Sequence, residues 1–320
     1  MADETGAVTG AGAVTGAGAV TGAGAAAGTG SVPYPEGVPC WVDAQLPDVE
    51  AGKRFYGELF GWTFRVAPGD GAHEVWAYPS GASTPLAALA PKPDGRLPTA
   101  WTLHFATPDA VALTARITAA GGQVIIPPTP VGTLGTAALA TDAEGAVFGL
   151  WQAGRHTGFG RRHEPGTFAW AELYARDTKA ANSFYAHLFH DALFGPDAAP
   201  DFGRATLTDV FPAEMPPHFL VHFGTEDCEA ALGTVSRLGG RVQVPPFGTS
   251  YGNVAVVTDN QGASFALLQQ WDGNGWREAP QEADQAEQRP DELRQRGDDR
   301  GEDEARPAGE HGATGPEDKG

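Results

Sequence analysis

Four side chains that can carry a proton recur at one place in a repeated pattern, each five residues before an aspartate. In chain order they are Asp43, His104, Glu172 and His222. An acid beside an imidazole can fix the tautomer of the ring, shift its pKa and exchange a proton with a bound molecule. Such a pair can equally be a structural ion pair or hydrogen bond that joins two elements. The order acid, His, acid, His predicts two pairs, Asp43 with His104 and Glu172 with His222.

The segments that hold these four residues are predicted strands, each followed by a helix. The strands read WVDAQLPD, WTLHFATPD, WAELYARD and FLVHFGTED. The closing Asp stands where a helix N-cap is expected, because its carboxylate can accept hydrogen bonds from free backbone amides. Apolar residues then recur three and four apart in VEAGKRFYGELFG, AVALTARITAAGG, TKAANSFYAHLF and CEAALGTVSRLGG, which is typical of helices. Short strand-like runs such as QVIIPP, TAALATD and AVFGLW follow, so the sequence predicts four βα units with added strands.

A longer repeat groups the four units into two domains. Trp41 and Phe55 match Trp170 and Phe184 at one constant offset. We therefore expect one domain over residues 36–155 and a second over residues 164–272, joined by a polar linker at 156–163. Histidines 73, 156, 163 and 187 have no predicted partner and are expected at the surface or in the linker.

The two ends of the chain differ in composition from the predicted domains. Residues 1–35 contain GAVTGA three times in succession, and residues 273–320 are rich in charge, Pro and Gln. Neither segment has the apolar side chains needed to offset its ordering entropy. We expect a flexible low-complexity leader and a disordered acidic tail.

Composition excludes several classes of function. The formal net charge of −19 argues against a nucleic-acid surface and against a basic membrane patch. No window is apolar enough for a membrane span, and the first residues do not form a secretory signal. The two cysteines, Cys40 and Cys228, lie at non-equivalent points of the repeat and give no disulfide framework. The sequence predicts a soluble cytoplasmic protein.

These motifs together resemble the vicinal oxygen chelate superfamily, which includes glyoxalase I, bleomycin-resistance proteins and extradiol dioxygenases. The resemblance is carried by the four strand–Asp–helix openings, by FYGELFGW and FYAHLF, by GGQVIIPP and GGRVQVPP, and by TDAEGAVFGLWQ and TDNQGASFALLQQ. It implies an α+β fold with two tandem domains, each made of paired βαβββ modules whose mixed sheet curls around a cleft.

The resemblance also implies where a divalent metal would be held. The family takes ligands from the first strands of two modules and from the last strand of the domain. In this chain the corresponding positions are Trp41, Thr102 and Gly149, and then Trp170, Leu220 and Ala266. Apart from one hydroxyl, none is a competent ligand, so we expect no metal cofactor. The alternative is a displaced metal site that uses Asp43, His104 and a third residue not evident from the sequence.

Strand alternation predicts which other side chains line each cleft. Residues two apart share a face, so Gln45 follows Trp41 and Asp43, and Tyr174 follows Trp170 and Glu172. We expect Trp41, Gln45, Trp170 and Tyr174 to contact a ligand. A tryptophan there can stack on a flat or apolar molecule, or it can simply fill the space left by a metal and its water.

The predicted function is therefore metal-independent binding of a small aromatic or apolar molecule, as in the bleomycin-resistance relatives. The alternative is an enzyme of lyase, dioxygenase or hydroxylase type that depends on a metal or on the acid–His pairs. The segment from Glu172 to His222 is shorter than that from Asp43 to His104, so the two clefts need not bind the same molecule. A monomer is preferred, because tandem domains can supply within one chain the pairing that single-domain relatives obtain as dimers.

Overall fold

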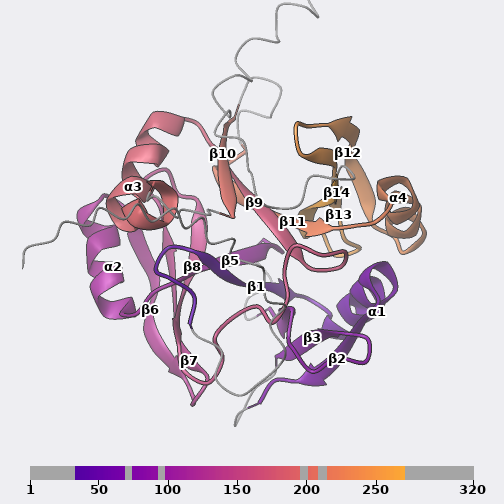
Figure 1. Ribbon diagram of the computed structural model, residues 1–320, viewed down its shortest axis with the longest axis horizontal. Helices are drawn as coiled ribbons and strands as arrows, with labels where there is room; N and C mark the ends of the chain where they lie inside the picture. Colours follow the sequence, from indigo (N-terminus) through magenta and orange to yellow (C-terminus); the bar gives the residue numbers. More distant parts are fainter. Residues whose placement is uncertain (1–32, 69–73, 93–97, 195–200, 208–214, 271–320) are drawn as a thin grey trace, which may run out of the picture. The chain divides into compact units, whose positions relative to one another are not determined.

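The computed structural model describes residues 33–68, 74–92, 98–194, 201–207 and 215–270 (Figure 1). All of them belong to one compact unit that begins at Pro33. The predicted tail at 273–320, nearly all of the predicted leader, and His73 lie outside the described residues. None of the described helices is long and apolar enough to cross a membrane.

The first half of the described chain forms one eight-stranded mixed sheet. Its elements are β1 (Pro39–Leu46), α1 (Val49–Phe60), β2 (Trp62–Val66), β3 (Val75–Pro79), β4 (Ala87–Pro91), β5 (Trp101–Ala106), α2 (Ala110–Ala119), β6 (Gln123–Val131), β7 (Gly135–Thr141) and β8 (Val147–Ala153). The strand order is β2-β3-β4-β1-β5-β8-β7-β6. Strands β1 and β5 pair antiparallel at the centre, so the two modules of this half meet there.

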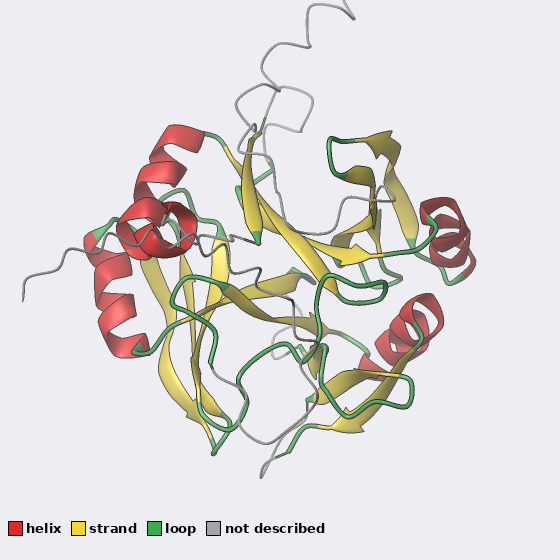
Figure 2. Cartoon of the chain, viewed as in Figure 1, coloured by secondary structure: helices red, strands yellow, loops and turns green. Residues whose placement is uncertain are grey.

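The second half forms a six-stranded mixed sheet. Its elements are β9 (Phe168–Ala175), α3 (Thr178–Phe194), β10 (Phe202–Thr206), β11 (His218–Gly224), α4 (Cys228–Arg237), β12 (Arg241–Gly248), β13 (Gly252–Thr258) and β14 (Ser264–Gln270). The order is β10-β9-β11-β14-β13-β12, and β9 pairs antiparallel with β11 as β1 does with β5. The α+β prediction is confirmed (Figure 2).

The third module departs from the predicted βαβββ pattern. In the described residues a single strand, β10, follows its helix α3, whereas β2, β3 and β4 follow α1. Strand β10 pairs parallel with β9 as β4 pairs parallel with β1, so it takes the place of β4. The shorter segment between Glu172 and His222 agrees with this difference.

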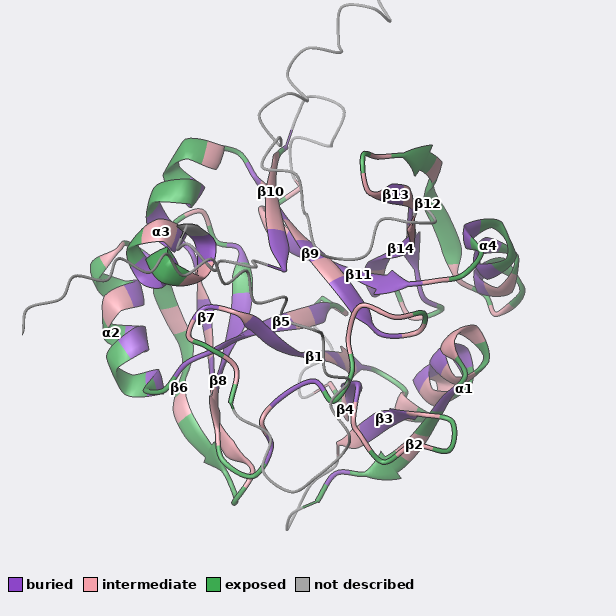
Figure 3. Cartoon of the chain, viewed as in Figure 1, coloured by how far each residue is buried: buried purple, intermediate pink, exposed green. Residues whose placement is uncertain are grey.

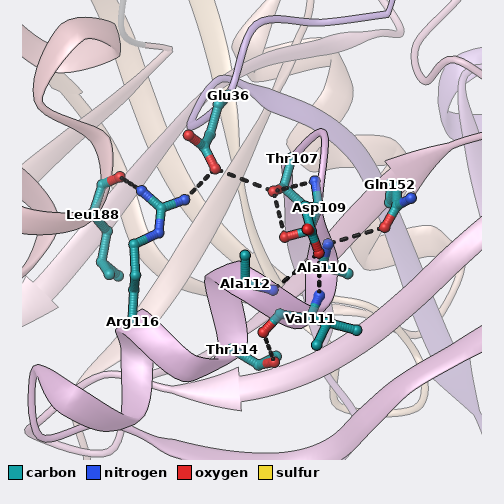
Figure 4. Close-up of polar contacts among 10 residues, drawn as sticks. All are labelled: Glu36, Thr107, Asp109, Ala110, Val111, Ala112, Thr114, Arg116, Gln152 and Leu188. Carbon is teal, nitrogen blue, oxygen red and sulfur yellow. Dashed lines mark hydrogen bonds and ion pairs between the residues drawn. The ribbon is translucent and has the colours of Figure 1, made fainter.

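The predicted aspartate caps are confirmed at each helix. Asp48, Asp109 and Asp227 are the N-caps of α1, α2 and α4, and Asp177 accepts hydrogen bonds from the amides of the first turn of α3. Figure 4 shows the start of α2, where one carboxylate oxygen of Asp109 accepts from two backbone amides at 3.0 Å. A capping carboxylate satisfies amides that have no partner within the helix, and it fixes the point at which the strand ends.

The helices pair between the two halves of the chain. Helix α1 lies beside α4, and α2 lies beside α3 (Figure 1). In Figure 4 the guanidinium of Arg116 on α2 reaches both Glu36 and the backbone oxygen of Leu188 on α3, the latter at 3.3 Å.

One large hydrophobic core contains residues from both sheets. Rings of the first half, including Trp62 and Trp101, contact Phe223 of the second half. The central strands are largely buried, while β12 and much of β6, at the outer edges of the two sheets, are exposed (Figure 3). Burial of large aromatic side chains on both sides of the boundary couples the two halves energetically.

Candidate functional site

Two antiparallel pairs, β1 with β5 and β9 with β11, place the four predicted proton-carrying residues in equivalent positions. Trp41 lies opposite His104 across β1 and β5, and Trp170 lies opposite His222 across β9 and β11. Each acid follows its tryptophan by two residues, on the same face of the strand. Acid and His are therefore diagonal cross-strand neighbours in both halves, close enough for long side chains to meet.

In the first half the predicted pair forms. His104 Nε2 hydrogen-bonds Asp43 Oδ2, and both side chains are largely buried. The imidazole lies directly against the backbone of β8, because a Cβ added at Gly149 would fall 2.1 Å from His104 Nδ1. Gly149 thus provides the space that the ring occupies.

The family's usual metal-ligand positions do not fit a metal in this chain. In the first half they hold an indole, a hydroxyl and Gly149, and the imidazole of His104 fills the space where a side chain at position 149 would project. In the second half they hold Trp170, Leu220 and Ala266, which offer no oxygen or imidazole donor. Among the described residues, no group of three or more His, Cys, Asp or Glu is placed to hold a metal ion.

Protein side chains cover Trp41, which was predicted to contact a ligand. Its indole is only 4% exposed and packs edge-on against His156, with ring centroids 4.3 Å apart. Trp76 packs on both rings. Trp41 thus fills space inside the protein, which is the second of the two roles expected for it, and His156, within the predicted linker, is buried. Burial lowers the pKa of His156 to about 4, so its ring is neutral at pH 7.

Near the Asp43–His104 pair lies a carboxyl group, that of Glu74, which sequence reasoning missed. Glu74 accepts a hydrogen bond from Trp76 Nε1 at 2.9 Å. Burial, together with the neighbouring charge of Asp43, raises the pKa of Glu74 to about 7. The available signal was the spacing of an acid two residues from a tryptophan, which Asp43 and Glu172 show as well, although Glu74 lies just before β3. Gln45, the second ligand contact predicted in the first half, is half-buried further along β1, opposite Ala90 on β4.

In the second half the predicted acid–His pair does not form. Glu172 Oε2 instead accepts a hydrogen bond from Trp170 Nε1 at 3.0 Å. His222 is 2% exposed, and burial lowers its pKa to about 4. For Glu172, an acid, burial has the opposite effect and raises the pKa to about 7. The Trp170 hydrogen bond and the charge of Arg204 partly oppose this increase. The indole of Trp170 takes the partner role that His104 has in the first half.

The face of the second sheet that holds Glu172 carries its own apolar cluster, separate from the main core. Three partly buried rings, Trp170, Tyr174 and Tyr251, pack against small and aliphatic side chains of β9, β11, β13 and β14. Those buried side chains are Ala169, Leu220, Val254, Ala266 and Leu268. We call Trp170, Glu172, Tyr174 and Tyr251 the aromatic patch. Tyr251 precedes β13 in a loop, and no sequence signal pointed to it.

The comparisons with known proteins agree with this architecture. The family model of the glyoxalase/bleomycin resistance protein/dioxygenase superfamily matches residues 41–150. Over 249 residues the chain is 33% identical to a Mycobacterium tuberculosis protein named "Putative glyoxylase CFP32", covering 73% of this chain and 95% of that one. It is 34% identical over 263 residues to the anthracycline biosynthesis protein DauV of Streptomyces sp. (strain C5), covering 73% and 93%. The chain therefore belongs to the glyoxalase/bleomycin resistance protein/dioxygenase superfamily, as the resemblance implied.

Solved structures support the fold. The Mn(II)-bound glyoxalase from Novosphingobium aromaticivorans matches with a TM-score of 0.50 at 15% identity, covering 74% of this chain and 84% of that one. The 2,3-dioxygenase LapB from Pseudomonas sp. KL28 matches with a TM-score of 0.52 at 16% identity, covering 77% and 95%. At such identities the likeness concerns the fold, while function resides in the particular site.

Proposed function

We propose that this protein binds a small aromatic molecule at the aromatic patch of its second half, without a metal ion. The observation that carries the proposal is the difference between the two halves. Trp41 is enclosed by His156 and Trp76, whereas Trp170 and Tyr174 remain partly exposed around a carboxyl group. Small-molecule sites typically combine apolar and aromatic walls with a few polar groups that fix orientation, and the patch has this composition.

The names of the relatives favour the same class of ligand. Two of them, DauV and DnrV, are named as anthracycline biosynthesis proteins. Anthracyclines are fused-ring aromatic molecules, and the flat rings of Trp170, Tyr174 and Tyr251 suit contact with such a surface. The residues at the family's metal-ligand positions lack suitable ligand atoms, and this supports binding that does not depend on a metal.

The test is a titration with 1-naphthylmethanol, a neutral planar probe, followed by fluorescence and by thermal shift. We expect Trp170→Ala and Tyr251→Ala each to weaken binding about tenfold, since an aromatic contact contributes on the order of 1 kcal/mol. The matched control is Phe247→Ala, which removes an exposed ring from β12 of the same sheet and should leave affinity unchanged. Equal affinity in the wild type and both patch variants would refute the assignment.

A second function is favoured by one observation in the first half. The Asp43–His104 pair lies near Glu74, whose pKa is about 7, and such groups can act as general acid and base near neutral pH. This alternative predicts turnover of a member of a panel of hemithioacetals and catechols. His104→Asn would abolish that turnover, and Trp170→Ala would spare it. The binding function predicts no turnover that depends on His104.

A further inference from the structure

The carboxyl group of Glu172 is the polar centre of the aromatic patch. Its Oε2 accepts from Trp170 Nε1, and both oxygens lie against the backbone of β10 at Gly203, where an added Cβ would be 2.9 Å from each of them. Gly203 also lies opposite Glu172 in the strand register. The close approach therefore requires glycine on β10, and it holds the carboxyl group beside the rings.

The charged group nearest in sequence to this contact, Arg204, projects from the other face of β10. Side chains alternate along a strand, so Arg204 shares the face of Phe202, a core residue, and its guanidinium lies 5.5 Å from the centre of that ring. The charge of Arg204 lowers the pKa of Glu172 only in part, because burial is the larger effect.

The other titratable groups around Glu172 come from β9, β11 and the loop before β13. Burial and the charge of Glu172 raise the pKa of Tyr174 to about 12 and also raise that of Tyr251, so both phenols are neutral at pH 7. His222 is neutral as well, with a pKa of about 4. His218 stacks on Tyr174 and its Nδ1 is 2.9 Å from the backbone oxygen of Pro216. At the end of β9, the guanidinium of Arg176 donates to the backbone oxygen of Met215.

An ionised carboxylate among apolar rings is costly unless a cation compensates it. The faces of Trp and Tyr rings attract cations in addition, and they do so more strongly when water is displaced. We infer that the aromatic patch selects an aromatic molecule that carries an ammonium group, with Glu172 as the counter-ion and Trp170, Tyr174 and Tyr251 as the flat contact surface. The inference rests on the proposed function and specifies its ligand class.

The inference has a consequence for pH. With a pKa of about 7, Glu172 is partly protonated in the free protein at neutral pH. A bound cation favours the ionised form, so binding displaces the proton and the affinity rises with pH up to about that value. Above it, the carboxylate is already ionised and the affinity becomes constant.

The experiment compares three probes of one shape: trimethyl(1-naphthylmethyl)ammonium, 1-naphthylmethanol and 1-naphthylacetate. Calorimetric titrations at pH 5.5, 7 and 8, in buffers of different ionisation enthalpy, give both the affinity and the protons released. At pH 8 we expect the cation to bind at least about tenfold tighter than the alcohol, and the anion to bind weakest. At pH 7 cation binding should release a fraction of a proton, and at pH 5.5 the preference for the cation should shrink.

Two variants complete the test. Glu172→Gln keeps the shape of the side chain but carries no charge, so it should lose both the preference for the cation over the alcohol and the proton release. The control is Glu229→Gln, which neutralises an exposed acid in the first turn of α4 and should behave like the wild type. A cation preference that survives in Glu172→Gln, or tighter binding of the alcohol or the anion at pH 8, would overturn the inference. Trp170-dependent binding of the alcohol without a cation preference refutes only this inference, whereas the absence of binding by all three probes refutes the proposed function as well.

Discussion

Tyr56 of the first half donates a hydrogen bond to Asp259 of the second half, with Oη 2.9 Å from Oδ2. The chain repeats this contact in reverse, since Tyr185 of the second half donates to Asp142 of the first at 3.2 Å. Each aspartate also accepts two backbone amides of its own turn through its other oxygen. A reciprocal pair of buried bonds thus connects a helix of each half to a turn of the other.

We predict that Tyr56→Phe destabilises the whole described unit. The substitution leaves Asp259 Oδ2 and Trp101 Nε1 without the phenol that now bonds both of them. Leaving buried polar groups unsatisfied costs about 1–3 kcal/mol. Urea unfolding of the variant and the wild type should show this decrease in the free energy of unfolding. Tyr78→Phe is the control, because among the described residues the Tyr78 hydroxyl has no hydrogen-bond partner, and it should cost less than about 0.5 kcal/mol.

The shared core predicts that the two halves unfold together. Far-UV circular dichroism and tryptophan fluorescence should report one coincident transition, and Tyr56→Phe should shift both signals equally. Two separate transitions, only one of them moved by the substitution, would show that the halves fold independently.

Gly149→Ala tests the packing of the His104 ring. The new methyl group would overlap the imidazole, so the ring must move and the bond to Asp43 is lost or strained. We expect a loss of about 1–3 kcal/mol, the usual cost of overpacking a core. Gly233→Ala in α4 is a control, because no atom of the described part of the chain lies within 4 Å of the added Cβ, and alanine should stabilise the helix by up to about 1 kcal/mol. Equal stability of Gly149→Ala and the wild type would mean that the ring is not held as described.

Much of the fold could be predicted from the sequence, because strand, aspartate cap and apolar helix face recur four times. The end of α3 could not: the helix continues to Phe194 across a kink at Phe189, beyond the repeated motif. The Asp43–His104 pair was predictable, because the resemblance to the family implies that the first strands of two modules face one another, as β1 and β5 do. The predicted Glu172–His222 pair does not form, because Glu172 bonds Trp170 and lies against Gly203 instead. The direction that a side chain takes within its face of the sheet could not be read from the sequence. Tyr251 and His156 come from loops, where the residue pattern does not determine position.

The pH dependence of the free energy of unfolding should reveal the raised pKa of Glu172. Its folded pKa of about 7 exceeds the ordinary value of 4.5, so its stabilising contribution is complete below pH 4.5 and is lost as the pH rises through 7. Relative to Glu172→Gln, the wild type should therefore lose up to about 3 kcal/mol between pH 4.5 and pH 8, at 1.36 kcal/mol for each unit of pKa shift. Urea unfolding at several pH values measures the difference. Parallel curves for the two proteins would show that Glu172 titrates normally.

Metal analysis separates the binding function from a metal-dependent reaction. After dialysis against Mn, Fe, Ni or Zn and removal of free ions, we expect much less than one equivalent to remain, because the described residues do not gather three ligands. One retained equivalent that His104→Asn removes would instead support the displaced site with Asp43.

The central claim is that the ligand binds at the aromatic patch, and the most direct test is to follow the NMR signals of the tryptophan indoles during ligand binding. Indole N–H resonances of ¹⁵N-labelled protein, assigned by Trp170→Phe and Trp41→Phe, are followed while trimethyl(1-naphthylmethyl)ammonium is added. The Trp170 resonance should move in a saturable way, since its N–H bonds Glu172 in the patch, and the enclosed Trp41 resonance should stay in place. Saturable movement of Trp41 with an unchanged Trp170 would contradict the account.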